Sequence, residues 1–218
     1  MTLQGVIFDL DGTLGDTLAA CFVAFRRALK GFSQREYTDD EIAARFGPSE
    51  EGMIRRLVPD RWEPCLRAYL AAYRECLPEH ARPIPGMKDA LHLLRTRGVT
   101  LAVVTGKGPH SAAVTLKHLD LADSFDMVET GSPEGSVKPV AIRKVLARWG
   151  VVPRQVAYVG DAPSDMEAAR EAGVIPLGAA WLPTTNAQAL RAMSPAATFL
   201  TLQDFIRWIE TNLDHTRC

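Results

Sequence analysis

The chain has no long apolar run and no excess of charge of one sign. None of its apolar stretches approaches the ~20 residues that a membrane-spanning helix needs, and the opening residues MTLQGVIFDLDG lack a basic segment followed by a cleavable apolar one. Lys and Arg number 25 against 26 Asp and Glu, so no basic field is available to hold a nucleic-acid backbone. We therefore expect a cytoplasmic protein that acts on small molecules, with no nucleic-acid and no membrane partner.

Cysteine is scarce and follows no metal-binding pattern. The four cysteines show no C-x-x-C spacing and have no nearby histidine that would complete a zinc site. We expect most of them to be buried or free thiols: Cys21, Cys65, Cys76 and Cys218. The chain also contains no internal repeat and no low-complexity tract.

Short apolar runs rich in β-branched residues alternate with helical patterns along most of the chain. With 218 residues, 47% of them hydrophobic, there is material for one substantial core and a smaller second domain. The runs are continuously apolar, as expected of parallel strands that helices cover on both faces. The predicted strands are Gly5 to Phe8, Val99 to Val104, Met127 to Glu129 and Gln155 to Val159. This rhythm predicts an α/β fold built from βαβ units.

Helices are predicted between these strands and at the end of the chain. Pro109 to Leu119 and Pro139 to Trp149 are expected to be crossover helices, the second closed by Gly150 as a C-cap. Thr201 to Leu213 is typical of a last amphipathic helix.

The long stretch from about Gly15 to Arg82 is helical in pattern throughout and contains no credible strand. Thr17 to Leu29 has apolar residues at helical spacing, Thr38 with Glu41 forms a capping box, and Asp60 is a candidate cap for a helix running to Leu77. The segment from 81 to 86 then breaks the periodicity with two prolines and a glycine. We expect a small helical domain, residues 16–82, inserted in an α/β domain made of residues 1–15 and 83–218.

Polar side chains follow the predicted strands at the points where they end. In an open parallel sheet the ligand lies outside the carboxyl ends of the strands, so these residues are expected to share one pocket. Alternation along an extended chain places Asp9 and Asp11 on the same side. The segment Thr105-Gly106-Lys107-Gly108 offers a hydroxyl and flexible backbone amides before a helix N-terminus, as a phosphate site needs. The remaining polar residues at these ends are Lys138, Asp161 and Asp165.

Each of these motifs alone has an ordinary structural explanation. Asp and Gly are common turn residues, a strand-end threonine often bonds locally, and a lone lysine is usually a solvated charge. Ser164 or Asp165 could simply cap the following helix. The joint placement at successive strand ends favours function, because gathered acids repel one another unless a cation joins them. Magnesium is the expected cation.

The motifs together strongly resemble those of the haloacid dehalogenase-like superfamily of phosphohydrolases, in its phosphoglycolate-phosphatase and β-phosphoglucomutase-like branch. F-D-L-D-G-T-L at Phe8 to Leu14 is highly specific, and V-V-T-G-K, V-K-P and V-G-D-A-P-S-D follow in the family order at Val103, Val137 and Val159. The resemblance spans nearly the whole chain. It implies a Rossmann-like core and a helical cap domain in the place where this chain has its helical insert.

The resemblance also implies a role for each matching residue. Asp9 corresponds to the nucleophile that becomes transiently phosphorylated, and Asp11 to the general acid and base. Mg²⁺ is expected on the carboxylates of Asp9 and Asp161 and the backbone carbonyl of Asp11. Thr105, the Gly106 amide and Lys138 are expected to hold the phosphoryl oxygens, with Asp165 supporting the metal shell or Lys138. The expected reaction is hydrolysis of a small phosphorylated metabolite, such as a phosphoglycolate-like phosphomonoester.

Other members of the superfamily fit the sequence less well. True dehalogenases lack the second acid of the first motif, and phosphonoacetaldehyde hydrolases replace it and use a cap lysine, whereas this chain has Asp11 and no lysine between Gly15 and Leu29. The β-phosphoglucomutases carry a histidine shortly after the D-T or D-S pair, where Asp16-Thr17 is here followed by L-A-A-C. A phosphosugar mutase and a catalytically silent binding protein remain as alternatives.

Substrate choice in this branch is expected to lie in the cap, where two residues are candidates. Arg45 could clamp a substrate carboxylate, or it could be an exposed helix-end charge near Asp40 and Glu41. Lys107 could meet an anionic substrate, or it could face solvent. The sequence leaves both open, together with the substrate and the oligomeric state, monomer or homodimer.

Overall fold

Six parallel strands form the central sheet, in the order β5-β4-β1-β6-β7-β8. The computed structural model describes residues 3–33 and 35–213. The strands are β1 (Gly5–Phe8), β4 (Thr100–Val104), β5 (Met127–Glu129), β6 (Val156–Gly160), β7 (Ile175–Ala179) and β8 (Ala197–Phe199). The first strand lies between β4 and β6 with every residue buried, as its continuous apolar run predicts.

The four predicted strands are confirmed, with boundaries within one residue, but two strands of the central sheet were not predicted. In β7, Pro176 and Gly178 interrupt an otherwise apolar run, and both residues are depleted in strands. In β8 only three residues are strand, which is too short for a period to be visible. Strand β7 forms by pairing with β6, and β8 forms by pairing with β7, rather than through local preference.

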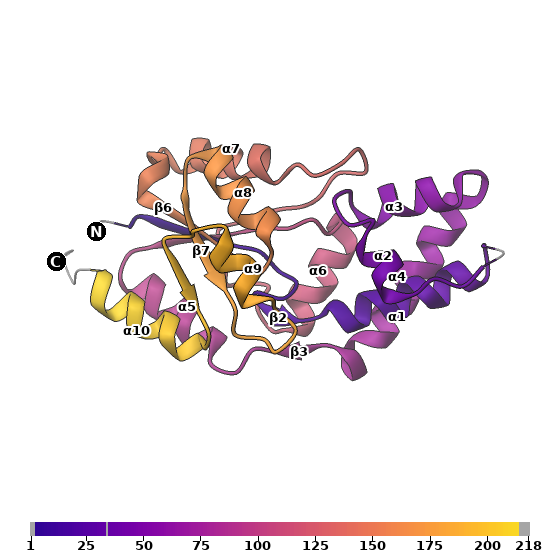
Figure 1. The fold of residues 1–218 in the computed structure, drawn as a ribbon, viewed down its shortest axis with the longest axis horizontal. Coiled ribbons are helices and arrows are strands. Elements are labelled where there is room, and N and C mark those ends of the chain that lie inside the picture. Colours follow the sequence, from indigo (N-terminus) through magenta and orange to yellow (C-terminus); the bar gives the residue numbers. More distant parts are fainter. Residues whose placement is uncertain (1–2, 34, 214–218) are drawn as a thin grey trace.

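Helices cover both faces of this sheet (Figure 1), so the predicted α/β class is confirmed. On one side lie α7 and α8, and on the other α5 and α10. The helices of this part are α5 (Met87–Thr96), α6 (Pro109–His118), α7 (Lys138–Trp149), α8 (Pro163–Ala172), α9 (Ala187–Ala192) and α10 (Leu202–Asn212), with a 3-10 turn at Pro153–Gln155. The three predicted helices match α6, α7 and α10, and Gly150 closes α7 in the left-handed conformation with φ 67°.

The segment from residue 18 to residue 80 is mainly helical and gathers at one end of the molecule (Figure 1). Its helices are α1 (Leu18–Lys30), α2 (Asp39–Ala43), α3 (Glu50–Leu57) and α4 (Trp62–His80), with a 3-10 turn at Pro59–Arg61. The predicted capping box is confirmed, because the Thr38 hydroxyl accepts from the Glu41 amide and the Glu41 carboxylate accepts from the Thr38 amide. The predicted Asp60 cap is wrong, since Asp60 lies inside the 3-10 turn and Arg61 precedes α4.

The expectation that the stretch from about Gly15 to Arg82 contains no strand is also wrong. Two-residue strands β2 (Gly15–Asp16) and β3 (Arg82–Pro83) pair antiparallel where the chain leaves and re-enters the α/β part. Neither strand could be recognised from the sequence, because one contains a glycine and the other a proline, and both residues are depleted in strands. This pairing holds the two connections between the helical segment and the α/β part side by side, which is the arrangement expected of a hinge.

Separate apolar clusters form in the helical segment and on the two faces of the sheet. Residues from Ala20 to Ala81 make up one cluster, whereas the two sheet faces pack against their own helices. Three of the four cysteines, Cys21, Cys65 and Cys76, are buried free thiols, and Cys218 lies outside the described residues.

We propose that residues 16–82 form a cap domain and that residues 1–15 and 83–218 form the core domain. Among the described helices, none is long and apolar enough to cross a membrane.

Candidate active site

A cavity of about 430 Å³ lies between the carboxyl ends of the central strands and the helices of the cap. The core contributes Asp9, Asp11 and Asp161 together with the loop after β4, and the cap contributes residues of α1, α3 and α4. All but two of the residues that the sequence singles out line this cavity; Asp165 lies just behind it and Arg45 lies elsewhere. The placement follows from the parallel sheet, which brings the ends of β1, β4 and β6 to one edge.

Asp9 and Asp11 both line the cavity, as the alternation after β1 predicts. The amide of Asp9 donates to the carbonyl of Val159 at 2.9 Å, which holds the start of the motif against β6. The carboxylate of Asp9 accepts from Lys138 Nζ at 2.8 Å. The carboxylate of Asp11 accepts a hydrogen bond from the buried hydroxyl of Thr17, at the entry to α1. Two carboxylates with different partners therefore face the same space.

Gly12 shows why the first motif needs a glycine. Its φ of 78° lies in the left-handed region, and a Cβ at this position would overlap the carboxylate of Asp161. Thr13 completes the contact, because its hydroxyl donates to Asp161 Oδ1 at 3.1 Å. The turn after β1 thus sets the position of the acid that follows β6.

Lys138 is held between two acids at the first residue of α7. Its Nζ lies 2.8 Å from Asp9 Oδ2 and 2.6 Å from Asp165 Oδ1. Asp165 is fully buried and also accepts from the Tyr158 hydroxyl at 3.3 Å and the Ala162 amide at 3.0 Å. Burial opposes the charge of Lys138, but Asp165 and Asp9 outweigh it and hold the pKa of Lys138 well above its ordinary value. Asp165 therefore positions the lysine and also caps α8, so both sequence interpretations of this residue apply.

Carboxylate oxygens of Asp9, Asp161 and Asp165 lie within 4.8 Å of one another, with Lys138 as their neighbouring cation. Burial raises the pKa of Asp9 to about 7, and Asp165 and Asp11 add to the rise while Lys138 opposes it. Burial, with the charges of Asp165 and Asp9, also raises the pKa of Asp161 well above its ordinary value. Clustered carboxylates of this kind are hard oxygen donors that a divalent cation would stabilise, so the residues fit a metal site.

The loop after β4 lines the cavity just before the start of α6. Thr105 Oγ1 accepts from the Lys107 amide at 3.2 Å, and Gly106 lines the cavity with nothing within 4 Å of the place where a Cβ would lie. Helix α6 has no side-chain cap of its own. The helix cap comes instead from the cap domain: Glu50 of α3 accepts from the Gly108 amide at 2.6 Å and from Ser111 Oγ at 2.5 Å. Hydrogen bonds thus connect the loop after β4 and the start of α6 directly to the cap domain.

Lys107 is buried rather than exposed, which rules out the solvent-facing alternative. Its Nζ lies 3.4 Å from Asp11 Oδ2 and 3.8 Å from Glu50 Oε1. It also donates to Cys21 Sγ at 3.0 Å and stands 4.3 Å from the centre of the Tyr73 ring. Burial opposes its charge, but Asp11 leads the groups that hold the pKa of Lys107 well above its ordinary value.

Arg45 does not reach the cavity, contrary to the clamp hypothesis. Its guanidinium turns back to the carbonyl of Glu41 and lies 5.6 Å from the Tyr37 ring centre. The next residues, Phe46, Gly47 and Pro48, line the cavity instead. The predicted loop therefore faces the site, but its arginine binds the Glu41 carbonyl in α2, which ends two residues before Arg45.

The Arg45→Ala variant is therefore expected to keep its kinetic constants on all substrates. A carboxylate clamp would instead raise KM for carboxylated phosphates alone. Steady-state kinetics on one carboxylated and one uncarboxylated phosphomonoester separates these outcomes, and a selective rise in KM would restore the clamp hypothesis.

The sequence interpretation missed several residues that build the site. Glu50 was not singled out, although Ser49 followed by two acids after a Gly-Pro pair is a helix-start signal. Thr17 was assigned only to a helix start, yet it binds Asp11. Tyr69 of α4 lines the cavity but carries no local signal, because an aromatic residue at helical spacing is most often part of a core.

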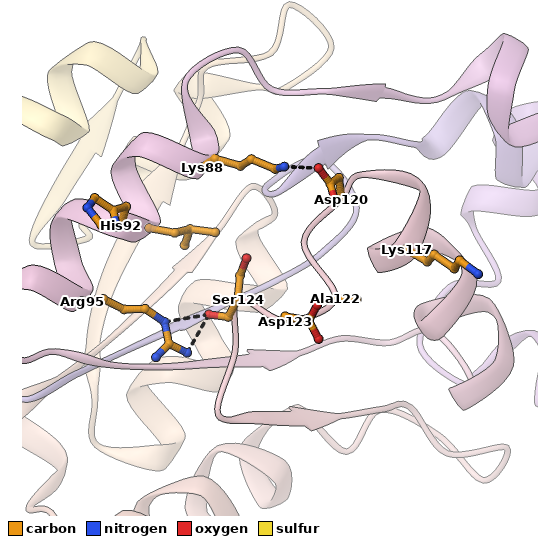
Figure 2. A pocket seen from close by; sticks show the side chains of 9 residues that line it. Lys88, His92, Arg95, Lys117, Asp120, Ala122, Asp123 and Ser124 are labelled. Carbon is orange, nitrogen blue, oxygen red and sulfur yellow. Dashed lines mark hydrogen bonds and ion pairs between the residues drawn. The ribbon is translucent and has the colours of Figure 1, made fainter.

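A second cleft of about 580 Å³ lies between α5 and the segment that joins α6 to β5 (Figure 2). Two of its three Lys and Arg side chains are engaged: Lys88 pairs with Asp120, and Arg95 donates to the Ser124 carbonyl at 3.0 Å. None of the predicted site residues lines this cleft. The strand-end cavity is therefore the candidate active site.

Comparison with known proteins places the chain in a well-populated group. The family model described as "Haloacid dehalogenase-like hydrolase" matches residues 6–179. The phosphoglycolate phosphatase of Neisseria meningitidis serogroup A is 32% identical over 187 residues, covering 81% of this chain and 80% of that protein. The "Probable phosphatase IndB" of Dickeya dadantii is 35% identical over 210 residues, covering 92% of this chain and 91% of that protein.

Solved structures share the fold over nearly the full length. A predicted phosphoglycolate phosphatase from Haemophilus somnus superposes with a TM-score of 0.80 at 24% identity, covering 95% of this chain and 98% of that one. A haloacid dehalogenase-like family protein from Streptococcus pneumoniae gives a TM-score of 0.77 at 25% identity, covering 95% and 99%.

Proposed function

Because the chain belongs to the haloacid dehalogenase-like hydrolase family, we propose that it is a magnesium-dependent phosphatase that hydrolyses a small phosphorylated metabolite through an aspartyl phosphate on Asp9. The observation that carries the proposal is one cavity holding Asp9, Asp11, Asp161, Thr105 and Lys138 at the carboxyl edge of the sheet. The relatives named as phosphoglycolate phosphatases make a phosphoglycolate-like phosphomonoester the first substrate to test. The protein is thus a phosphoric monoester hydrolase.

In the first step, Asp9 attacks the phosphorus of the substrate. A bond forms between a carboxylate oxygen of Asp9 and phosphorus, and the bond from phosphorus to the substrate alkoxide breaks. Lys138, 2.8 Å from Asp9 Oδ2, holds the carboxylate in place and balances charge on the phosphoryl oxygens. Asp165 in turn fixes Lys138, so it orients the nucleophile indirectly, through the lysine.

Asp11 moves the proton in both steps. It first gives its proton to the departing alkoxide, and then takes a proton from the water that attacks the aspartyl phosphate. That attack breaks the bond between phosphorus and Asp9, releases inorganic phosphate and restores both side chains. The Thr17 hydroxyl donates to Asp11 Oδ1, and Asp11 Oδ2 lies 3.4 Å from Lys107 Nζ, so both oxygens of this carboxylate are held in position.

The loop after β4 is proposed to hold the phosphoryl group during both steps. The Thr105 hydroxyl and the Gly106 amide line the cavity beside Lys138. Backbone and hydroxyl donors placed before a helix N-terminus stabilise negative charge on phosphate oxygens. Catalysis then rests mostly on position and electrostatics.

The carboxylates of Asp9 and Asp161, with the backbone carbonyl of Asp11, are proposed to hold Mg²⁺. Oxygen ligands of this kind are the ones Mg²⁺ prefers, and when bound it neutralises charge on the phosphoryl group. Asp165 already has hydrogen-bond partners on both carboxylate oxygens, which supports a positioning role for it.

The test is phosphate release by the purified protein from phosphoglycolate, hexose phosphates, nucleotides and pyrophosphate, with Mg²⁺ and with chelator. Release from one or a few compounds that stops on chelation and returns with Mg²⁺ would support the proposal. Conversion of one sugar phosphate to its isomer without phosphate release would favour a phosphosugar mutase. Binding of a compound without turnover would favour a silent binding protein.

A further inference from the structure

The cavity has two halves with different chemistry. The half next to the strand ends holds the acids and lysines described above, and it fits the phosphoryl group. The half next to the cap is walled mostly by apolar side chains, among them Phe46, Leu18 of α1 and Met53 of α3, and it also contains Glu50 of α3. The organic part of a phosphomonoester that occupies the first half must lie against this second, apolar wall.

The charges that line the cavity do not favour a second anion on the substrate. Among the described residues that line it, two lysines stand against four carboxylates. Lys107 is the cation nearer the cap, and its Nζ already forms ion pairs with Asp11 at 3.4 Å and Glu50 at 3.8 Å. Arg45, the cap residue expected to offset a carboxylate, is turned away. A carboxylate in this half would face acids without a free cation.

One polar atom on this side is buried without a partner. Tyr69 is fully buried and lines the cavity, and its hydroxyl has no hydrogen-bond partner among the described residues. Its ring is fixed between Phe25 and Tyr73, with ring centres 4.4 and 5.8 Å away. The hydroxyl of Tyr73, by contrast, is 2.7 Å from Thr115 Oγ1. A buried hydroxyl left unpaired costs free energy unless a bound group supplies its partner.

We propose that the cap half of the cavity binds an uncharged and mainly apolar organic group, and that the Tyr69 hydroxyl donates a hydrogen bond to a neutral oxygen on it. Tyr69 is thus a specificity-determining residue, and the substrate class is a phosphomonoester with a hydroxyl, carbonyl or ether oxygen beyond a short carbon chain. The inference rests on the proposed phosphatase function, and it ranks a carboxylated substrate such as phosphoglycolate below a neutral one of similar length.

The test uses three series of alkyl phosphates with chains of two to five carbons, ending in a methyl group, a hydroxyl or a carboxylate. All have primary alkoxide leaving groups, and phosphoglycolate is the two-carbon carboxylate. Flexible chains let the terminal oxygen find its partner, so the best member of each series is compared. The wild-type protein, Tyr69→Phe and Tyr73→Phe are assayed with Mg²⁺, and the melting temperature of each is measured.

The expected order of kcat/KM for the wild-type protein is hydroxyl above methyl above carboxylate. Tyr69→Phe is expected to lower kcat/KM about tenfold for the hydroxyl series alone, the size of one good hydrogen bond, mainly through KM. Its melting temperature should not fall, because no hydrogen bond to another described residue is lost. Tyr73→Phe is the matched control: it loses the bond to Thr115, so its melting temperature should fall while the order of substrates stays the same.

Two results would overturn the inference while leaving the phosphatase in place. One is a preference for the carboxylate series, and the other is an equal effect of Tyr69→Phe on the hydroxyl and methyl series, including no effect. Failure of every compound in all three series, and of the metabolite panel, would instead reject the proposed function. A fall in the melting temperature of Tyr69→Phe would show that its hydroxyl has a partner within the protein, and would also count against the inference.

Discussion

The Asp9→Asn variant is expected to release no measurable phosphate while keeping the fold. The amide is nearly the same size as the carboxylate, but it is a poor nucleophile and cannot form the aspartyl phosphate. Loss of an enzyme's nucleophile lowers turnover by about four to six orders of magnitude. Phosphate release under saturating substrate measures the loss, and circular dichroism checks the fold.

Asp123→Asn is the matched control for this variant, because it makes the same change at an exposed position away from the cavity. It should keep wild-type turnover. Activity of Asp9→Asn within tenfold of the wild type would reject the proposed nucleophile. An inactive Asp9→Asn with a native fold, beside an active control, would leave the metal and the proton donor as the next parts of the mechanism to test.

The same substitution should make the protein more stable in chelator, in a pH-dependent way. Burial raises the pKa of Asp9 to about 7 from its ordinary value of 3.8, so the folded state disfavours ionised Asp9. For an acid with a raised pKa, stability falls as pH rises from the unfolded pKa to the folded one. The stability advantage of Asp9→Asn should therefore grow between about pH 4 and pH 7, because the amide does not ionise. An advantage that shrinks over this range would contradict the electrostatic description of the site.

The parts of the site that could be predicted from sequence are those fixed by strand ends. A parallel sheet places the residue after each buried strand at one edge, so the apolar runs before Asp9, Thr105 and Asp161 were enough to bring these residues together. The helix starts at Thr38 and Thr201 were predictable for a similar reason, because a capping box is a local pattern.

The parts that could not be predicted depend on how the cap meets the core. Glu50 becomes a cap for α6 only because α3 docks on the loop after β4, a contact between residues 58 positions apart. Lys107 is buried by α1 and α4 rather than by its own neighbours in sequence. The outward turn of Arg45 and the unpaired hydroxyl of Tyr69 are likewise results of packing, and no period or motif in the sequence encodes them.

Replacing Lys138 with methionine is expected to destabilise the protein strongly and also to lower its activity. Methionine fills a similar volume but leaves Asp9 and Asp165 facing each other without the cation that now lies 2.8 and 2.6 Å from them. Removing one partner of a buried ion pair costs about 3–5 kcal/mol, because the remaining charge stays buried. Turnover should fall about a hundred- to a thousandfold, as it does when a donor to transition-state charge is removed.

Lys144→Met on the same helix is the matched control for Lys138→Met. Lys144 pairs with Glu129 at 2.8 Å, but its side chain is 66% exposed. Exposed pairs contribute about 1 kcal/mol or less, so this variant should stay close to the wild type in urea unfolding with chelator. Adding Mg²⁺ should restore part of the stability of Lys138→Met, since a divalent cation offsets the same carboxylates. Equal costs for the two variants would mean that Lys138 does not hold the acids together, and an absent response to Mg²⁺ would contradict the proposed metal site.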